Sequence, residues 1–299
     1  MRLKKKWQIG TRALRFAGRR ASMVPMLEFH KYQALGNDFV IVDGSCEGSG
    51  MSEARVKEIC HRNQGVGADG VLVWVPEPGS AGRMVVWNAD GTKSDMCGNG
   101  LRCMAHYLYE TQRVSQEQRT LDLWAGEKSF RCEKLANDEF LVVMGTPDFD
   151  HGDLPKSNSS DGVLRLECAD REFSLWTAHF GNPHAVTLSS TPLRDAQRYG
   201  EQLSNHEVFP ARANINFAKT GAEEVELVVY ERGVGITQAC GSGACATTTA
   251  LVMANLLGPD QAHVIALPGG KLKIALSSDK IVTMQGKAQL SFVGKSSGL

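Results

Sequence analysis

The sequence lacks several features that would point to familiar classes of protein. No apolar run in its 299 residues is long enough to cross a membrane. Lys and Arg number 33, as do Asp and Glu, and the formal charge of zero gives no reason to expect a nucleic-acid partner. The Walker pattern is absent, and the glycine-rich stretch 64–70 precedes a predicted strand, whereas a dinucleotide-binding loop follows one. No lysine stands in a context that indicates Schiff-base chemistry, so pyridoxal phosphate is not expected.

The chain also lacks an apolar signal segment, which disfavours a disulfide framework for its eight cysteines. We therefore predict free thiols in the cytoplasm. A four-cysteine zinc site is disfavoured, because five residues separate Cys97 from Cys103 and four separate Cys240 from Cys245. Apart from Cys97 and Cys240, the cysteines are expected to be small buried apolar residues, namely Cys46, Cys60, Cys103, Cys132, Cys168 and Cys245.

The first 25 residues differ in composition from the rest. They carry eight basic residues and no acidic residue, so residues 26–299 hold a formal charge of −8. Such a segment is typical of a plastid-type transit peptide, of a basic surface tail, or of a start codon upstream of a true start at Met26. The lysine run at 4–6 and the scarcity of serine disfavour a transit peptide. We predict a dispensable, disordered extension.

Two stretches of the sequence repeat one pattern. Residues 84–108 and 227–251 align without a gap at a constant offset of 143 positions. Each begins with a β-branched apolar run that ends in an aromatic residue, which is typical of a strand. A polar residue and a glycine-containing turn follow, and then Cys97 in one stretch and Cys240 in the other. Small and apolar residues at helical spacing come next, so we predict that each cysteine lies where a loop enters a helix.

A cysteine at the N-terminus of a helix is suited to acid–base chemistry. Unpaired backbone N–H groups and the helix dipole favour the thiolate over the thiol. The glycines after Cys97 and Cys240 let backbone amides approach a ligand, and such amides bind carboxylates. Two copies related by an internal repeat predict two cysteines that face one cleft from opposite sides. This arrangement suits a reaction in which a proton leaves one face of a carbon and returns to the other.

Polar residues at matched positions support the repeat. Asn37 and Asn182 each follow a glycine, 60 and 58 positions before their cysteine. His184 is either a hydrogen-bonded structural residue or a neighbour of a cysteine whose protonation it tunes. Glu231 aligns with Asn88, so we expect both to point at the cleft, where a carboxylate near a thiol can help take its proton.

Many short predicted strands and few helices indicate the fold. They predict an α+β protein of two pseudo-symmetric, barrel-like domains with the active site in the cleft between them. Besides the two cysteine helices, amphipathic helices are predicted at 52–63, with Ser52 as N-cap, and around 192–203.

A turn-rich segment at 147–162 is the clearest linker. We therefore predict one half at residues 26–145, joined by the C-terminal strand at 286–299, and the other at 146–285.

Six short motifs stand in a characteristic order and spacing. They are Leu35-Gly36-Asn37-Asp38-Phe39, Asn88-Ala89-Asp90-Gly91, Met96-Cys97-Gly98-Asn99-Gly100, Gly181-Asn182-Pro183-His184, Tyr230-Glu231-Arg232-Gly233 and Ala239-Cys240-Gly241-Ser242-Gly243. Together they resemble the diaminopimelate epimerase family. The resemblance covers roughly residues 27–292, and the paired cysteine motifs are highly specific.

The resemblance implies an isomerase without metal or cofactor, a homodimer of two-domain α/β subunits that interconverts LL- and meso-2,6-diaminopimelate in lysine and peptidoglycan precursor biosynthesis. It implies that Cys97 and Cys240 act as thiolate base and thiol acid on opposite faces of the α-carbon, assisted by His184 and Glu231. The implied substrate-binding residues are Gly98, Asn99, Gly241 and Ser242 at the reacting carboxylate, and Asn37, Asn88, Asn182, Asn214, Glu231 and Arg232 at the amino groups and the distal carboxylate.

Two positions depart from the family pattern. Ile236-Thr237 stands where Glu-Thr is common, so one polar contact is expected to be missing. Gly70 stands where some members have a substrate-contacting Gln. Neither change affects the cysteines.

Two other functions fit the same residues. One is a racemase of proline, hydroxyproline or histidine on this fold, although four asparagines and Arg232 exceed what a substrate with one amino-acid end would use. The other is a thiol redox or carboxylate-binding protein that uses the same helix-start cysteines.

Overall fold

The computed structural model describes residues 26–45, 50–159 and 162–296. The predicted basic extension at 1–25 and Cys46 lie outside these residues. Within the described ranges, no helix combines the length and the apolar composition needed to cross a membrane.

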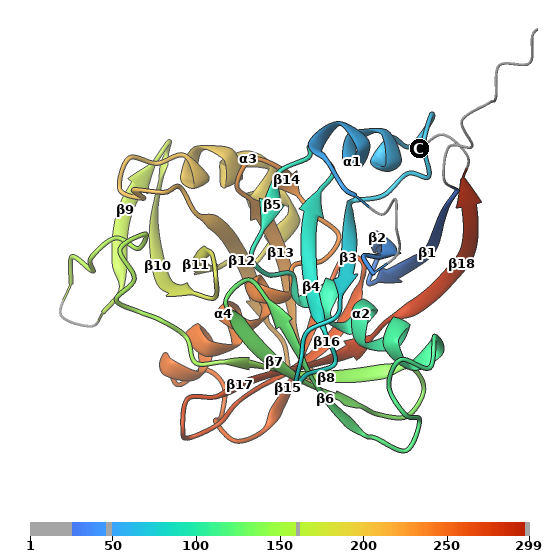
Figure 1. Cartoon of the computed structure of the whole chain (residues 1–299). Helices are drawn as coiled ribbons and strands as arrows, with labels where there is room; N and C mark the ends of the chain where they lie inside the picture. The colour runs from blue at the N-terminus through green and yellow to red at the C-terminus, as the bar shows by residue number, and fades with distance from the viewer. Residues whose placement is uncertain (1–25, 46–49, 160–161, 297–299) are drawn as a thin grey trace, which may run out of the picture.

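The N-terminal half folds as a curved mixed sheet around one helix (Figure 1). Ser52 caps the other helix of this half, as predicted, by accepting a hydrogen bond from the Arg55 N–H. The elements of this half are β1 (Leu27–Ala34), β2 (Asn37–Asp43), α1 (Glu53–Cys60), β3 (Gly70–Val75), β4 (Arg83–Asn88), β5 (Lys93–Ser94), α2 (Gly98–Glu110), β6 (Thr120–Ala125), β7 (Lys128–Lys134) and β8 (Glu139–Gly145).

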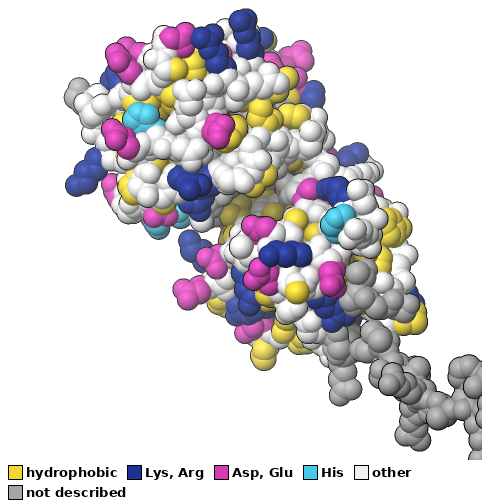
Figure 2. Space-filling view, turned by 90° about the horizontal axis from the view of Figure 1, so that it is seen from above, with side chains coloured by type: hydrophobic (Ala, Val, Ile, Leu, Met, Phe, Trp, Pro, Cys, Tyr) yellow, Lys and Arg dark blue, Asp and Glu magenta, His cyan; other side chains and the backbone are white. Residues whose placement is uncertain are grey.

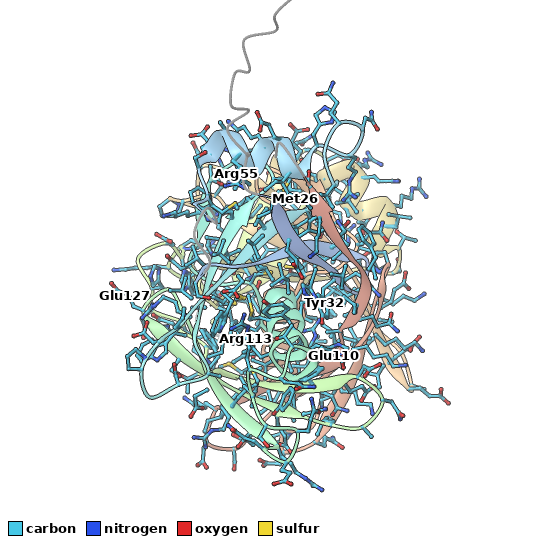
Figure 3. All side chains as sticks on the ribbon, turned by 45° about the vertical axis from the view of Figure 1, so that its right-hand side comes forward. Met26, Tyr32, Arg55, Glu110, Arg113 and Glu127 are labelled. Carbon is cyan, nitrogen blue, oxygen red and sulfur yellow. The ribbon has the colours of Figure 1, made fainter. Side chains whose placement is uncertain are left out.

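Helix α2 lies inside the sheet because it is buried on nearly every side. All of its residues from Gly98 to Tyr109 are buried, which is the pattern of a helix surrounded by protein. It contacts the strands of this half from β1 to β4 and from β6 to β8. Tyr32 of β1 packs edge-on against His106 of α2, with ring centroids 5.4 Å apart, and Figure 3 labels Tyr32 beside the helix.

The C-terminal half repeats this arrangement element by element. Its central helix is α4, and α3 takes the position that α1 has in the first half. Its elements are β9 (Leu164–Cys168), β10 (Arg171–His179), β11 (Pro183–Leu188), α3 (Pro192–Ser204), β12 (Asn214–Thr220), β13 (Glu224–Glu231), β14 (Gly235–Ile236), α4 (Gly241–Met253), β15 (Ala262–Leu267), β16 (Gly270–Leu276) and β17 (Val282–Lys287).

The strand pairings of the two halves match. The parallel pairs are β2–β3 and β4–β6 in one half, and β11–β12 and β13–β15 in the other. The other neighbouring strands within each half are antiparallel. The predicted α+β fold of two pseudo-symmetric halves is confirmed, and the repeat extends from one unit to the whole half.

Two strand pairings tie the halves together. β8 pairs antiparallel with β17, so the sheet continues from one half into the other. After β17 the chain returns, and β18 (Gln289–Ser296) pairs antiparallel with β1. In the second half, β9 occupies the corresponding place beside β10. The space-filling view shows two lobes that meet at a narrower waist (Figure 2).

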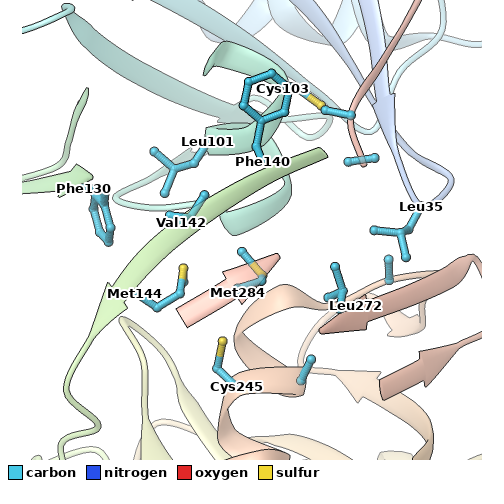
Figure 4. Packing of buried hydrophobic residues seen from close by; sticks show 14 of the residues in the cluster. Leu35, Leu101, Cys103, Phe130, Phe140, Val142, Met144, Cys245, Leu272 and Met284 are labelled. Carbon is cyan, nitrogen blue, oxygen red and sulfur yellow. The ribbon is translucent and has the colours of Figure 1, made fainter. Parts of the chain in front are cut away.

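One core cluster extends across both halves. It contains Leu101 of α2, Leu251 of α4 and Met284 of β17. In Figure 4, Met144 and Met284 lie between the two helix-borne cysteines of the core. The predicted burial of the other cysteines is confirmed for Cys60, Cys103, Cys132, Cys168 and Cys245.

Candidate active site

Each half contributes one cysteine at the N-terminus of its central helix. Cys97 precedes α2 and Cys240 precedes α4, and both have extended backbone conformations, with φ of −141° and −128°. Cys97 Sγ accepts a hydrogen bond of 3.3 Å from the Gly100 N–H, as an N-cap side chain does. The prediction that both cysteines stand at helix starts is confirmed.

The two helix starts lie against each other. Asn99 Nδ2 donates to the carbonyl oxygen of Ala239, the residue before the second cysteine, at 3.4 Å. Met284 lies between Gly98 and Gly241. A Cβ added to Gly98 would lie 2.9 Å from Met284 Cε, and one added to Gly241 would lie 3.0 Å from Met284 Sδ. Glycine at both positions therefore lets the two helix N-termini pack on the same methionine.

Glu231 affects both thiols. Its carboxyl group accepts a hydrogen bond of 2.6 Å from Thr237 Oγ1, and its charge raises the pKa of the Cys240 thiol. The charge of Glu231 also acts on Cys97, where it raises the pKa of the thiol. One carboxyl group at the end of β13 thus interacts with the cysteines of both halves.

Burial controls the protonation of the two cysteines. It raises the pKa of the Cys97 thiol to about 11, against the opposing effect of hydrogen bonds from the Gly100 and Asn99 backbone. Burial also raises the pKa of Cys240 well above its ordinary value, and the charge of Glu231 adds to this shift. The backbone amides at the helix starts favour the thiolate, as predicted, but the loss of water outweighs them and raises the pKa of both thiols.

His184 reaches Cys240 through one hydroxyl group. Its Nε2 lies 3.0 Å from Ser242 Oγ, which in turn lies 3.6 Å from Cys240 Sγ. The same nitrogen lies 2.9 Å from Asn182 Oδ1. Burial lowers the pKa of His184 to about 3, so its imidazole is neutral at physiological pH. The structure thus brings together four residues predicted for the site, with Ser242 between the histidine and the thiol.

The asparagines predicted for the site in the first half do not all lie together. Asn99 Nδ2 donates to Asn37 Oδ1 at 3.1 Å, so these two side chains lie together beside the first cysteine. Asn88 is exposed at the end of β4, where it donates to Thr92 Oγ1 within its own turn at 2.9 Å. Asn88 therefore forms no hydrogen bond with the other candidate residues in the described part of the chain.

Asn214 and Arg232 form a second group of candidate residues. Asn214 is buried, and its Oδ1 accepts a hydrogen bond of 3.0 Å from the Arg232 N–H. The Arg232 guanidinium is exposed and donates to the Ala211 carbonyl at 2.7 Å. It forms no ion pair with any described residue, so it can still bind an anion.

Two buried residues of the site were missed from the sequence. Arg102 donates from Nη2 to Asn99 Oδ1 at 2.7 Å, and the i, i+3 spacing of these two residues on one helix could have signalled the contact. Asn216 Oδ1 lies 3.4 Å from His184 Nδ1. It comes from the neighbouring parallel strand β12, so no local pattern could have paired it with the histidine.

The packing explains one of the two departures from the family pattern. A Cβ added to Gly70 would lie 2.5 Å from the Trp87 carbonyl oxygen, so the tight pairing of β3 with β4 requires glycine there. Ile236 is 38% exposed, and Thr237 is the member of the pair that contacts Glu231.

Comparisons with known proteins agree with this geometry. A family model described as diaminopimelate epimerase matches residues 29–149 and 176–291. The diaminopimelate epimerase of Rippkaea orientalis is 36% identical over 279 residues, which cover 90% of this chain and 98% of that protein. The diaminopimelate epimerase of Prochlorococcus marinus is 37% identical over 292 residues, covering 91% and 93% respectively.

A solved structure shares the fold at much lower identity. A hydroxyproline epimerase from Agrobacterium vitis superposes with a TM-score of 0.67 and 13% identity, covering 93% of this chain and 94% of that one. This likeness concerns the fold alone, whereas the family model and the relatives above match the sequence itself. The chain therefore belongs to the diaminopimelate epimerase family.

Proposed function

We propose that the chain interconverts LL- and meso-2,6-diaminopimelate by moving a proton between two cysteines. Membership of the family makes the chain an isomerase. One observation carries the proposed mechanism: Cys97 and Cys240 stand at equivalent helix starts, and Glu231 interacts with both. The halves that supply the cysteines are residues 26–145 joined by β18, and residues 146–285.

Epimerisation needs a base on one face of the α-carbon and an acid on the other. In one direction, the thiolate of one cysteine removes the α-proton and the thiol of the other gives its proton to the opposite face. In the reverse direction the two exchange roles. Because burial keeps both thiols protonated, one must first lose a proton. We assign this proton to Glu231, because its carboxyl group interacts with Cys240 and burial raises its pKa above the ordinary value of a carboxyl group.

The backbone amides at the two helix starts suit the carboxylate next to the reacting carbon. Helix N-termini bind anions through free N–H groups and the helix dipole. Hydrogen bonds to this carboxylate also stabilise the charge that develops when the α-proton leaves. The residues that supply these amides are Gly98, Asn99, Gly241 and Ser242.

The far end of the substrate needs a separate set of partners. Arg232 is exposed and forms no ion pair with a described residue, so we assign the distal carboxylate to its guanidinium. Asn214 holds the backbone of Arg232 in place. The amino groups are assigned to Glu231 and to the side chains of Asn37, Asn88 and Asn182.

His184 is assigned a supporting role at the second cysteine. A neutral imidazole cannot supply a charge, but through Ser242 it orients a hydroxyl group toward Cys240 Sγ. This hydrogen bond stabilises the thiolate when it forms, because a hydroxyl group donates more strongly to a charged acceptor.

We also propose that the chain works as a homodimer in the cytoplasm. Within the described residues, β18 pairs with β1 alone, and its Leu290, Phe292 and Val293 are 37%, 49% and 49% exposed. An edge strand with exposed apolar side chains favours pairing with a second copy. All cysteines among the described residues are free, which suits a reducing compartment. Light scattering should give a dimer for the wild type and a monomer for Val293→Asp, and a monomeric wild type would contradict the proposal.

Exchange of the α-proton in D₂O tests the reaction. Wild-type enzyme, Cys97→Ala and Cys240→Ala are each incubated with LL-diaminopimelate, meso-diaminopimelate, L-proline, trans-4-hydroxy-L-proline and L-histidine. We expect exchange with the two diaminopimelates alone and a loss of inversion of about 10²- to 10⁴-fold in either variant. Cys245→Ala, at a buried position on α4, is the matched control and should retain activity.

Other outcomes separate the remaining functions. Exchange with proline, hydroxyproline or histidine alone would replace the proposal with a racemase of that amino acid. Reversible formation of a disulfide between Cys97 and Cys240, with no exchange on any substrate, would replace it with a redox protein.

A further inference from the structure

A second cluster of reactive side chains lies away from the cysteines, on the segment that links the two halves. His151 and Asp153 come from this segment, and His179 ends β10. Their ligand atoms all lie within 4.8 Å of one another, and no other such group of three His, Cys, Asp or Glu residues occurs in the described part of the chain. Asp153 Oδ2 is 3.7 Å from His151 Nδ1 and 3.8 Å from His179 Nε2.

We propose that His151, Asp153 and His179 bind a divalent transition-metal ion, with Zn²⁺ as the preferred occupant. Two imidazole nitrogens and one carboxylate oxygen, with water at the fourth position, form a donor set that suits zinc. Calcium and magnesium prefer oxygen donors throughout. The class of ligand therefore follows from the side chains themselves.

The separations of the donor atoms fit this assignment. Zinc bonds of about 2.0–2.2 Å in a tetrahedral site put the donor atoms about 3.3 Å apart. The distances to Asp153 exceed this value by less than 1 Å, and the His151 and Asp153 side chains are 39% and 41% exposed, so they can rotate inward. Closing the site needs side-chain rotation alone.

The rings of the two histidines lie face to face. Their rings are stacked, with centroids 3.7 Å apart and planes 7° apart. His151 Nδ1 also accepts a hydrogen bond of 3.2 Å from the Asp153 N–H, which shows that this nitrogen carries a lone pair. When the metal binds, the two rings give up their stacked contact and each coordinates the ion.

Backbone hydrogen bonds hold the linker beside the end of β10. Asp148 and His179 exchange two hydrogen bonds, of 3.1 Å and 2.8 Å, which fix the linker to the end of β10. From His179 the chain turns directly to Asn182 and His184 of the active site. The linker runs from β8 to β9 (Figure 1). A metal ion bound here holds the linker between the two halves against the end of β10. His184 of the active site follows this strand in the chain.

Zinc titration of the metal-free, untagged full chain against a chromophoric chelator tests the proposal. We expect one Zn²⁺ per wild-type chain. His151→Gln, Asp153→Asn and His179→Gln should each raise the Kd at least tenfold, since loss of an outer-shell partner alone costs about 10- to 100-fold. Asp150→Asn removes an exposed carboxylate from the same linker and should bind like the wild type.

Two further measurements identify the atoms bound to zinc and check that the variants fold. X-ray absorption of the bound zinc should show nitrogen and oxygen neighbours without sulfur, which excludes the free thiols. Thermal melting of the metal-free variants should match the wild type, and Asp153→Asn, being isosteric and half-exposed, serves if a histidine variant fails to fold. Sulfur coordination, wild-type affinity in all three variants, or no binding by the wild type at micromolar zinc would overturn the proposal. None of these readouts depends on the epimerase reaction.

Discussion

Arg102 donates a hydrogen bond of 2.7 Å to Asn99, and both residues are buried, with exposed fractions of 0% and 3%. Asn99 in turn donates to Asn37 and to the Ala239 carbonyl, the link between the two helix starts. Burial lowers the pKa of Arg102, and the guanidinium has no carboxylate partner among the described residues. A buried cation therefore fixes the orientation of the side chain that joins the cysteine loops.

Replacing Arg102 by Met should slow epimerisation without unfolding the protein. Asn99 loses the donor that orients it, so we expect kcat to fall at least about tenfold, with a smaller change in KM. The melting temperature should change little, because an apolar side chain in place of an unpaired buried charge is often neutral or stabilising. Steady-state kinetics and thermal melting check this, with Met104→Leu as a volume-conserving control on α2. An unchanged kcat would mean that Asn37 and Ala239 alone hold Asn99.

Replacing Glu231 by Gln should change thiol reactivity and turnover in opposite directions. The charge of Glu231 raises the pKa of Cys97 and of Cys240, so its removal should let both thiols ionise at lower pH. The acceptor for the Cys240 proton is lost, and turnover should fall about 10²-fold. The pH dependence of iodoacetamide alkylation and the rate of exchange in D₂O measure the two effects. Thr237→Ser keeps the hydroxyl group that donates to Glu231 and should change neither.

The buried His184 should make the protein sensitive to acid. Its pKa is about 3 in the folded chain and near 6.5 in the unfolded chain. Between these values the unfolded chain binds one proton more, so the free energy of unfolding falls as pH falls, by roughly 1 kcal/mol per pH unit. Urea unfolding at pH 7, 6, 5 and 4 should show a shallower slope for His184→Gln than for the wild type. Parallel slopes would contradict the shifted pKa.

Replacing Gly70 by Ala should destabilise the fold by about 1–3 kcal/mol. The new Cβ would lie 2.5 Å from the Trp87 carbonyl oxygen, and backbone atoms in paired strands cannot move aside cheaply. Gly152→Ala is the control, because nothing lies within 4 Å of a Cβ at that position. Urea unfolding compares the two variants, and equal stability would show that the strand pair relaxes.

Local patterns in the sequence were sufficient where structure depends on local chemistry. The repeated run of strand, turn and cysteine placed Cys97 and Cys240 correctly, because N-cap geometry is set by the few residues around it. Ser52 was identified as a helix cap for the same reason. The repeat also predicted two similar halves, because equivalent apolar patterns bury equivalent faces.

Contacts between distant segments were outside the reach of these patterns. Asn216 meets His184 across parallel strands 32 positions apart in the sequence. The burial of the thiols also depends on the whole core, so the helix N-terminus alone could not predict that the pKa values of the thiols are raised. His151 and His179 come together because the linker folds back on β10. Neither the linker nor the end of β10 has a periodic sequence pattern that could predict this contact.

The pairing of the last strand with the first has a consequence for biosynthesis. β1 is the first described strand to be synthesised, yet its outer neighbour β18 (Gln289–Ser296) is synthesised after every other described strand. The edge of β1 in the N-terminal half therefore stays unpaired until residues 289–296 are available, whereas in the C-terminal half β9 precedes its partner β10 in the chain. A chain that ends at residue 288 would contain every strand of only one lobe, the one synthesised second.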